Sequence, residues 1–138
     1  MRTTSIVLDE GRDEVWRFLT LPELMAMWMP NVDNLHSADG GPLESGSILR
    51  FDARGATHES HVTAMEAGVA LELTSTQGAV TAVYRYALSD ADTGTRLALS
   101  IDCRATGALS FLSPVIGLVV WLTDKSQPEK LKAAMRTA

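Results

Sequence analysis

The histidines come first, because imidazole is a common metal ligand and proton carrier. The chain has three of them, and His58 and His61 lie three positions apart in a segment that alternates like a β-strand. Successive strand side chains point to opposite faces, so these two rings cannot hold one ion without a bulge. His36 falls beside a loop and is expected in solvent. We therefore predict no metal site and no cofactor, and keep His61 as either a surface residue or a polar anchor for a ligand.

Nucleophilic catalysis finds no supporting motif. Ser110 and Ser113 lie at the apolar start of a predicted helix without the Gly-x-Ser-x-Gly pattern of a nucleophile elbow. The Gly40-Gly41 pair has no following lysine and no phosphate-binding pattern. Cys103, the single cysteine, sits in an alternating segment and is expected to be a buried, inert thiol. We assign no catalytic residue.

Two tyrosines share one face of a predicted strand. Alternation in the segment 79–88 places Tyr84 and Tyr86 on one face together with Ala82 and Leu88. A hydroxyl that faces a cavity could orient a ligand carbonyl, whereas core tyrosines would direct their hydroxyls to solvent or backbone. Asp52 and Asp102 alternate away from their apolar neighbours and are expected in water. Without a carboxylate inside, acid–base catalysis has little support from the residues alone.

The elements that would position these residues begin with a strand at 3–8 and a helix containing Val15, Phe18 and Leu19 at i, i+3 and i+4. Thr20-Leu21-Pro22-Glu23 then reads as a second helix start, with Thr20 as cap and Pro22 in the first turn. This short helix is expected to run to about Trp28, because Pro30 biases the residue before it away from helical geometry.

Period-two alternation dominates the next seventy or so residues. The predicted strands are 31–36, 47–54, 58–66, 69–76, 79–88 and 95–104, with turns at Gly, Asp and Pro between them. Because short turns and no helices join these strands, they should form an antiparallel meander.

The only long helical candidate is the segment 107–138. Its part 114–122 is apolar nearly all round and should face a cavity, while 127–135 has Leu131 and Met135 at i, i+4 on an otherwise polar helix. Pro128 leaves two alternatives: a kinked continuous helix, beside which a ligand gate could lie, or a break and restart at the capping pattern 126–129. The predicted fold is α+β, with the antiparallel sheet closed by this helix, in one domain covering 1–138.

Composition excludes several classes of protein. With 138 residues, 46% apolar and 21% charged, the chain fits one globular domain. The longest apolar run, 115–122, is far short of the roughly 20 residues that span a bilayer, so no stable membrane insertion is expected. The N-terminus lacks a secretory apolar core, which favours the cytoplasm. Net charge is −5 and most basic residues are scattered singly, which argues against nucleic-acid binding.

This order of elements, with particular residues in place, resembles a known superfamily. The residues are Val15-Trp16, Pro22-Glu23, Trp28-Met29-Pro30, Gly46, Gly94-Thr95-Arg96-Leu97 and Leu131-Lys132. They are similar to the START-like or Bet v 1-like superfamily (SRPBCC), in its bacterial polyketide cyclase/dehydrase-like branch. The resemblance implies a helix-grip fold whose sheet curls around the long helix and leaves a cavity for lipids, polyketides or other hydrophobic molecules. Members of the superfamily include cyclases and co-chaperone domains.

We therefore expect a small hydrophobic or amphipathic molecule to bind between sheet and C-terminal helix. The predicted ligand-binding residues are Met25, Trp28 and Met29 at the mouth, Phe51, Tyr84, Tyr86, Val120 and Trp121 on the walls, and His61 as polar anchor. The alternative for each is an ordinary core or surface position, and Trp16, Leu73 and Leu99 are assigned to the core outright. Two other functions stay open: a polyketide cyclase or dehydratase-type enzyme, and a protein-interaction module, with a homodimer possible.

Overall fold

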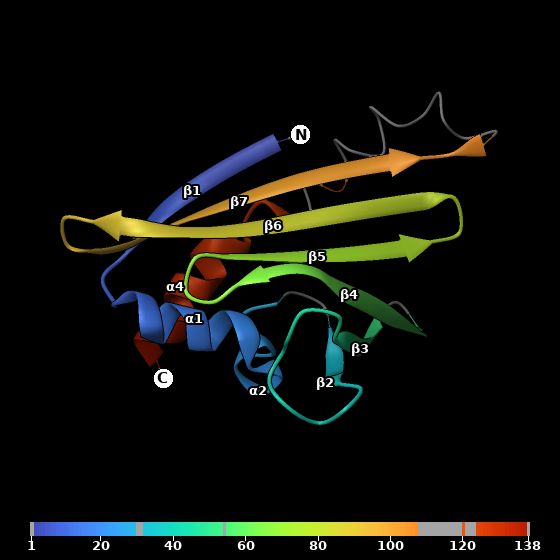
Figure 1. Cartoon of the computed structure of the whole chain (residues 1–138), viewed down its shortest axis with the longest axis horizontal. Helices are drawn as coiled ribbons and strands as arrows, with labels where there is room; N and C mark the ends of the chain where they lie inside the picture. Colours follow the sequence, from blue (N-terminus) through green and yellow to red (C-terminus); the bar gives the residue numbers. More distant parts are fainter. Residues whose placement is uncertain (1, 30–31, 54, 108–119, 121–123, 138) are drawn as a thin grey trace.

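The computed structural model describes residues 2–29, 32–53, 55–107, 120 and 124–137. Its elements follow the predicted order, with a strand, two short helices, six further strands and a C-terminal helix (Figure 1). The strands are β1 (Arg2–Leu8), β2 (Asp33–Ser37), β3 (Ile48–Ala53), β4 (Ala56–Glu66), β5 (Ala70–Gln77), β6 (Val80–Ala91) and β7 (Gly94–Ala105). The helices are α1 (Arg12–Thr20), α2 (Pro22–Met25) and α4 (Gln127–Thr137).

The strands form one seven-stranded sheet in the order β1-β7-β6-β5-β4-β3-β2. Every neighbouring pair is antiparallel, including β1 with β7, which joins the start of the chain to its last strand. The meander that the short turns predict is therefore confirmed, and register shifts in the β2–β3 and β4–β5 pairs add irregularity along the way.

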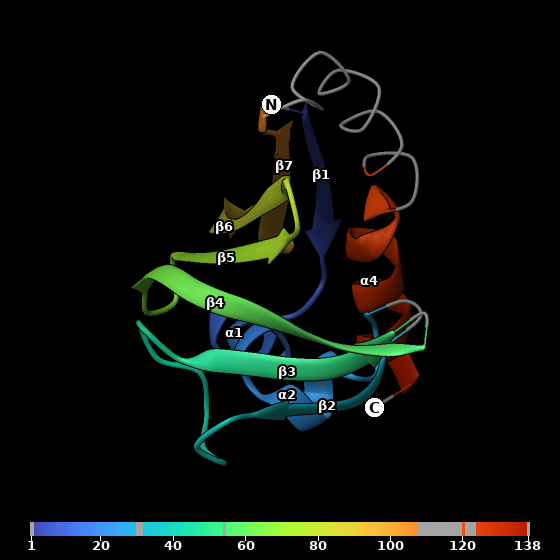
Figure 2. The same cartoon turned by 90° about the vertical axis from the view of Figure 1, so that its right-hand side faces the viewer.

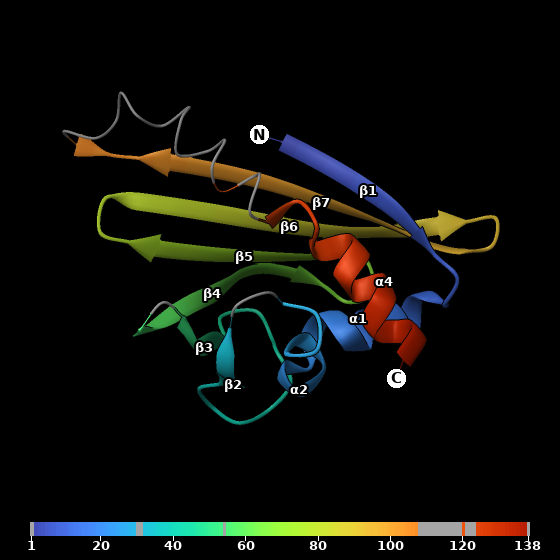
Figure 3. The ribbon, with the colours of Figure 1, turned by 180° about the vertical axis from the view of Figure 1, so that it is seen from behind.

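The sheet is strongly curved, and the helices lie on its concave side. Figure 2 shows the strands from β1 to β2 arranged around an arc that α4 and α1 close, and Figure 3 shows α4 crossing beside β1 and β7. Helix α1 buries Val15, Phe18 and Leu19, as their spacing predicts. Helix α4 buries Leu131 and Met135 in the same core cluster. The predicted helix-grip architecture is confirmed.

The junction between α1 and α2 differs from the prediction in detail. Thr20 is the last residue of α1, and its hydroxyl donates a hydrogen bond to the carbonyl oxygen of Trp16 at 2.8 Å. The break falls at Leu21, whose extended backbone (φ −98°, ψ 117°) ends one helix and precedes the next. Thr20 therefore does not cap α2, although Pro22 does open it. Helix α2 ends at Met25, before the predicted end at about Trp28, and residues 26–28 form a turn.

The C-terminal segment breaks and restarts near Pro128. Asp124 is helical, Lys125 and Ser126 form a turn, and α4 begins at Gln127. The backbone N–H of Lys130 donates to the carbonyl of Ser126 at 3.0 Å, so the helical hydrogen bonds start again there. Pro128 lies in the first turn, where its missing N–H would have no intrahelical partner.

This break removes the premise of a kinked continuous helix, and with it the reason for placing a gate beside Pro128. Of the apolar segment 114–122, only Val120 belongs to the described residues. Within the part of the chain that the structure covers, no helix has the length and apolar character needed to cross a membrane.

Candidate ligand-binding site

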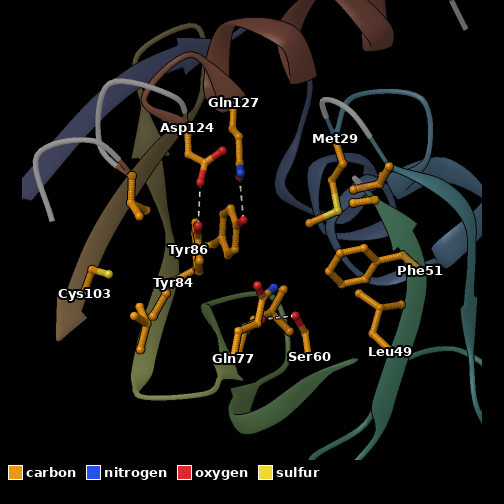
Figure 4. A pocket seen from close by; sticks show the side chains of 17 residues that line it. Met29, Leu49, Phe51, Ser60, Gln77, Tyr84, Tyr86, Cys103, Asp124 and Gln127 are labelled. Atoms are coloured by element: carbon orange, nitrogen blue, oxygen red, sulfur yellow. Dashed lines mark hydrogen bonds between the residues drawn. The ribbon is translucent and has the colours of Figure 1, made fainter. Parts of the chain in front are cut away.

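A cavity of about 560 Å³ lies between the inner face of β3–β7 and the residues around the start of α4 (Figure 4). Most of its wall is apolar or uncharged. The lining residues are Met29, Val32, Leu49, Phe51, Ala53, Ser60, Leu73, Ser75, Gln77, Val80, Ala82, Tyr84, Tyr86, Cys103, Val120, Asp124 and Gln127. The strand residues among them recur at every second position, so they all belong to one face of the sheet.

Two hydrogen bonds join this face to the start of α4. The Tyr84 hydroxyl donates to Oδ2 of Asp124 at 2.5 Å, and the Tyr86 hydroxyl donates to Oε1 of Gln127 at 2.6 Å. Tyr86 is 2% exposed and Gln127 5% exposed, so this second pair is almost fully removed from water. We call Tyr84, Tyr86, Asp124 and Gln127 the polar cluster. It forms one side of an otherwise mostly apolar cavity, as Figure 4 shows.

The electrostatics of the polar cluster keep both tyrosines protonated. Burial raises the pKa of Tyr84 well above its usual range, and the negative charge of Asp124 and its hydrogen bond raise it further. Burial also raises the pKa of Tyr86, with a second contribution from Asp124. Neither phenol can therefore act as a tyrosinate base near neutral pH. Both instead act as hydrogen-bond donors that fix the side chains of Asp124 and Gln127.

The other polar side chains on the wall, Ser60, Ser75, Gln77 and Cys103, carry no formal charge. The hydroxyls of Ser60 and Ser75 hydrogen-bond to each other across β4 and β5. Cys103 also lines the cavity, and burial, followed by the negative charge of Asp102, raises the pKa of its thiol. At neutral pH this group remains a thiol, which makes it a weak nucleophile.

Five of the predicted ligand-binding residues line the cavity: Met29, Phe51, Tyr84, Tyr86 and Val120. Met25 and Trp28 lie in the core, at 0% and 2% exposure. The indole N–H of Trp28 donates to the carbonyl of Phe18 at 2.8 Å, and its ring packs edge-on against Tyr86 with centroids 6.0 Å apart. Trp28 therefore supports the cavity wall from behind. Trp121 lies outside the described residues.

His61 is exposed on the outer face of the sheet and does not line the cavity. Its strand neighbours Ser60 and Val62 are buried on the inner side, so alternation turns His61 outward. His58 has the opposite orientation and packs near the Phe51 ring, with centroids 5.7 Å apart. The prediction that the two histidines face opposite sides is confirmed. His61 does not reach the cavity, which leaves the surface position that was its alternative.

The sequence reasoning missed Asp124 and Gln127. Leu73, which it assigned to the core, belongs to the buried core cluster at 2% exposure and also borders the cavity. A signal was present: Val120, Asp124 and Gln127 follow the i, i+4, i+7 spacing of one helical face. Ser60 and Ser75 could also have been predicted to face inward, because each lies two positions from a buried residue of the same strand, Val62 and Leu73 respectively.

The family model described as "Polyketide cyclase / dehydrase and lipid transport" matches residues 3–136, nearly the whole chain. The chain belongs to this family. The START-like or Bet v 1-like resemblance (SRPBCC) carried by the sequence is thereby confirmed. A search of curated protein sequences finds no match.

Solved structures agree with the fold of this polyketide cyclase/dehydrase and lipid transport family member. Protein MLL2253 from Mesorhizobium loti is 18% identical, with a TM-score of 0.74 over 99% of this chain and 98% of its own. Ara h 8.0201 is 14% identical, with a TM-score of 0.75 over 99% and 97%. DynU16, from the dynemicin biosynthetic locus, is 19% identical, with a TM-score of 0.67 over 98% of this chain and 46% of its own. At these identities the likeness establishes the fold alone.

Proposed function

We propose that this protein binds an amphipathic small molecule in the cavity between the sheet and the start of α4. The observation that carries the proposal is the cavity itself, about 560 Å³ of space that its own side chains leave open. Small-molecule sites typically measure roughly 300–1,000 Å³ and combine apolar walls with a few placed polar groups. Here the walls come from five strands and the polar cluster supplies the placed groups.

The surface gives less support to a protein-interaction module. Among the described residues, Met27 is the one large hydrophobic side chain with about half of its surface exposed, at 47%. Protein interfaces usually need a contiguous apolar patch of a few hundred Å², and a single side chain does not form one. Among the described residues, the apolar surface available for binding is therefore concentrated inside the cavity.

A cavity-filling substitution tests the binding function. Ala82 lines the cavity, so Ala82→Leu should occupy ligand space while keeping an apolar side chain on the inner face. Ala87 lies on the same strand but is exposed on the other face, which makes Ala87→Leu a matched control. Native mass spectrometry of protein purified from its own host should find a co-purifying compound on the wild type and Ala87→Leu. Ala82→Leu should carry much less of it.

The same measurement contains the contrary result. If Ala82→Leu folds, as judged by denaturant unfolding, and retains the compound at the wild-type level, the cavity is not the binding site. A wild-type protein that carries no compound and gains no thermal stability from any amphiphile would overturn the binding function altogether, because a ligand that binds the native state must stabilise it.

A second candidate is acid–base catalysis of the polyketide cyclase or dehydratase type. The specific observation in its favour is Asp124 on the cavity wall, hydrogen-bonded to the protonated Tyr84. A carboxylate can accept a proton from a bound substrate, and the neighbouring phenol can hold that carboxylate in position. Incubating the co-purifying compound with the wild type should then convert it, either with loss of water or, for ring closure alone, to an isomer of the same mass that chromatography separates. At saturating compound, Asp124→Asn should lose this conversion.

A further inference from the structure

The hydroxyl protons of the polar cluster are already committed within the protein. A tyrosine has a single O–H proton, and those of Tyr84 and Tyr86 go to Asp124 and Gln127 at 2.5 and 2.6 Å. What the phenols can offer a ligand is therefore their oxygen lone pairs. An ionised carboxylate at Asp124 likewise only accepts hydrogen bonds. The side-chain amide of Gln127 adds a donor to the cluster, but a neutral one.

The charges around the cavity point the same way. No lysine, arginine or histidine lines it among the described residues. Of the residues that the description does not cover, only Arg54 has a basic side chain, and the variant Arg54→Ala below tests its role. Among the described residues, a ligand carboxylate would meet Asp124 with no lining cation between them, and like charges in a poorly solvated site repel strongly. A ligand hydroxyl or ammonium would instead donate to the acceptors of the polar cluster.

We propose that the cavity selects amphiphiles whose polar end donates a hydrogen bond, an alcohol or a protonated amine, over those that end in a carboxylate. This inference rests on the proposed binding function and adds its specificity. The apolar tail occupies the space lined by Leu49, Phe51 and Leu73, and the polar end meets Tyr84 and Asp124. The phenol and carboxylate orient the ligand.

The test compares four ligands that share one chain and differ at one end: decylamine, decanol, decyl methyl ether and decanoate. At neutral pH the amine is protonated and the acid ionised, whereas the alcohol and ether are neutral. Binding to the intact protein is measured by isothermal titration calorimetry below the micelle-forming concentration. The amine and alcohol should bind at least roughly tenfold more tightly than decanoate, a difference of about 1.4 kcal/mol. The alcohol should also bind more tightly than the ether, which cannot donate.

Substitutions locate the effect. Asp124→Asn removes the negative charge from the polar cluster, so it should weaken amine binding and narrow the gap between amine and decanoate. Asp102→Asn is the matched control, because Asp102 carries the same charge but does not line the cavity. Tyr84→Phe is a second variant, which removes the phenol hydroxyl and leaves the carboxylate of Asp124 in place. Arg54 follows the lining residue Ala53 and lies outside the described residues, so Arg54→Ala checks whether it supplies a cation.

Each possible outcome of these binding measurements either supports the proposed specificity or overturns it. Decanoate binding as tightly as the amine and alcohol would overturn this specificity while leaving the binding function intact. The specificity would also be overturned if the preference for amine and alcohol over decanoate were the same in the wild type, Asp124→Asn and Tyr84→Phe. If none of the four ligands binds the wild type, the proposed binding function fails first. If decanoate binds well and loses affinity in Arg54→Ala, the cavity accepts anions through Arg54 and the donor rule is wrong.

Discussion

At the scale of single residues, Tyr84 and Tyr86 connect the sheet to the start of the C-terminal helix. Each hydroxyl reaches a side chain far along the sequence, 40 residues away for Tyr84 and 41 for Tyr86. Buried polar atoms need such partners, because an unpaired one costs roughly 1–3 kcal/mol of stability. The same contacts that stabilise the fold therefore also define the polar side of the cavity.

These two side chains predict a loss of stability at alkaline pH. The pKa values of both tyrosines are raised in the folded protein. In the unfolded chain each tyrosine titrates at its ordinary pKa of about 10. Above that pH the unfolded chain releases protons that the native protein keeps, so the free energy of unfolding falls as pH rises. Below a pH of about 10, the contribution of the two protonated tyrosines to the free energy of unfolding is fully present. Each tyrosine should remove about 1.4 kcal/mol per pH unit in this window.

Urea unfolding of the wild type and of the double variant Tyr84→Phe/Tyr86→Phe measures this. The wild type should lose stability more steeply with alkaline pH than the variant, which lacks both titrating groups. The chain has two tyrosines in all, so tyrosinate absorbance reports on these residues alone. An absorbance rise near the ordinary tyrosine pKa, with the native circular dichroism retained, would contradict the prediction.

At the scale of elements, the junction of β1 with β7 depends on a close backbone approach. A Cβ on Gly94 would overlap the carbonyl oxygen of Leu8 and lie 2.8 Å from the carbonyl carbon of Asp9. The next residue, Thr95, is 0% exposed and its hydroxyl donates to the carbonyl of Glu10 at 2.9 Å. The Gly-Thr pair that opens β7 therefore fixes the chain where the first strand ends.

Gly94→Ala should consequently destabilise the protein, by about 1–3 kcal/mol, because backbone rather than a flexible side chain must move. Gly11→Ala is the matched control, since a Cβ there meets nothing within 4 Å and its φ is −71°. That variant should stay within about 1 kcal/mol of the wild type. Denaturant midpoints compare the two. Equal midpoints for both variants would mean that β1 and β7 can separate at no cost.

At the scale of the whole molecule, one core cluster joins both ends of the chain. It contains Leu8 of β1, Phe18 of α1 and Leu131 of α4, together with inward residues of most strands. Helix α4 contacts β1 and β7, so the last element packs on the first. No part of the described fold has a core of its own, which predicts a single cooperative unfolding transition.

Tryptophan fluorescence and far-ultraviolet circular dichroism should therefore give the same denaturant midpoint. Leu131, at 0% exposure, is the sharpest probe, and Leu131→Ala should lower both midpoints together, by about 2–5 kcal/mol in stability. The exposed neighbour Lys130 serves as control, because Lys130→Ala should change stability by about 0.5 kcal/mol or less. Two separate transitions would show that the chain is more than one unit.

The order of strands and helices, and the face to which each strand residue points, follow from the amino-acid sequence. Those properties depend on neighbours a few positions away: alternation placed Tyr84 with Tyr86 and set His58 against His61, and glycine turns made the meander. The same local signals placed the core face of α1 and the stripe formed by Leu131 and Met135.

Which inward residues line open space and which fill the core depends instead on the three-dimensional packing. Met25 and Met29 look alike in sequence, yet one is buried and the other lines the cavity. The same holds for Asp124, which becomes a cavity residue through the hydroxyl of Tyr84 on another element. Alternation specifies the face but not what lies opposite it, because that depends on how the curved sheet meets the helices across long sequence separations.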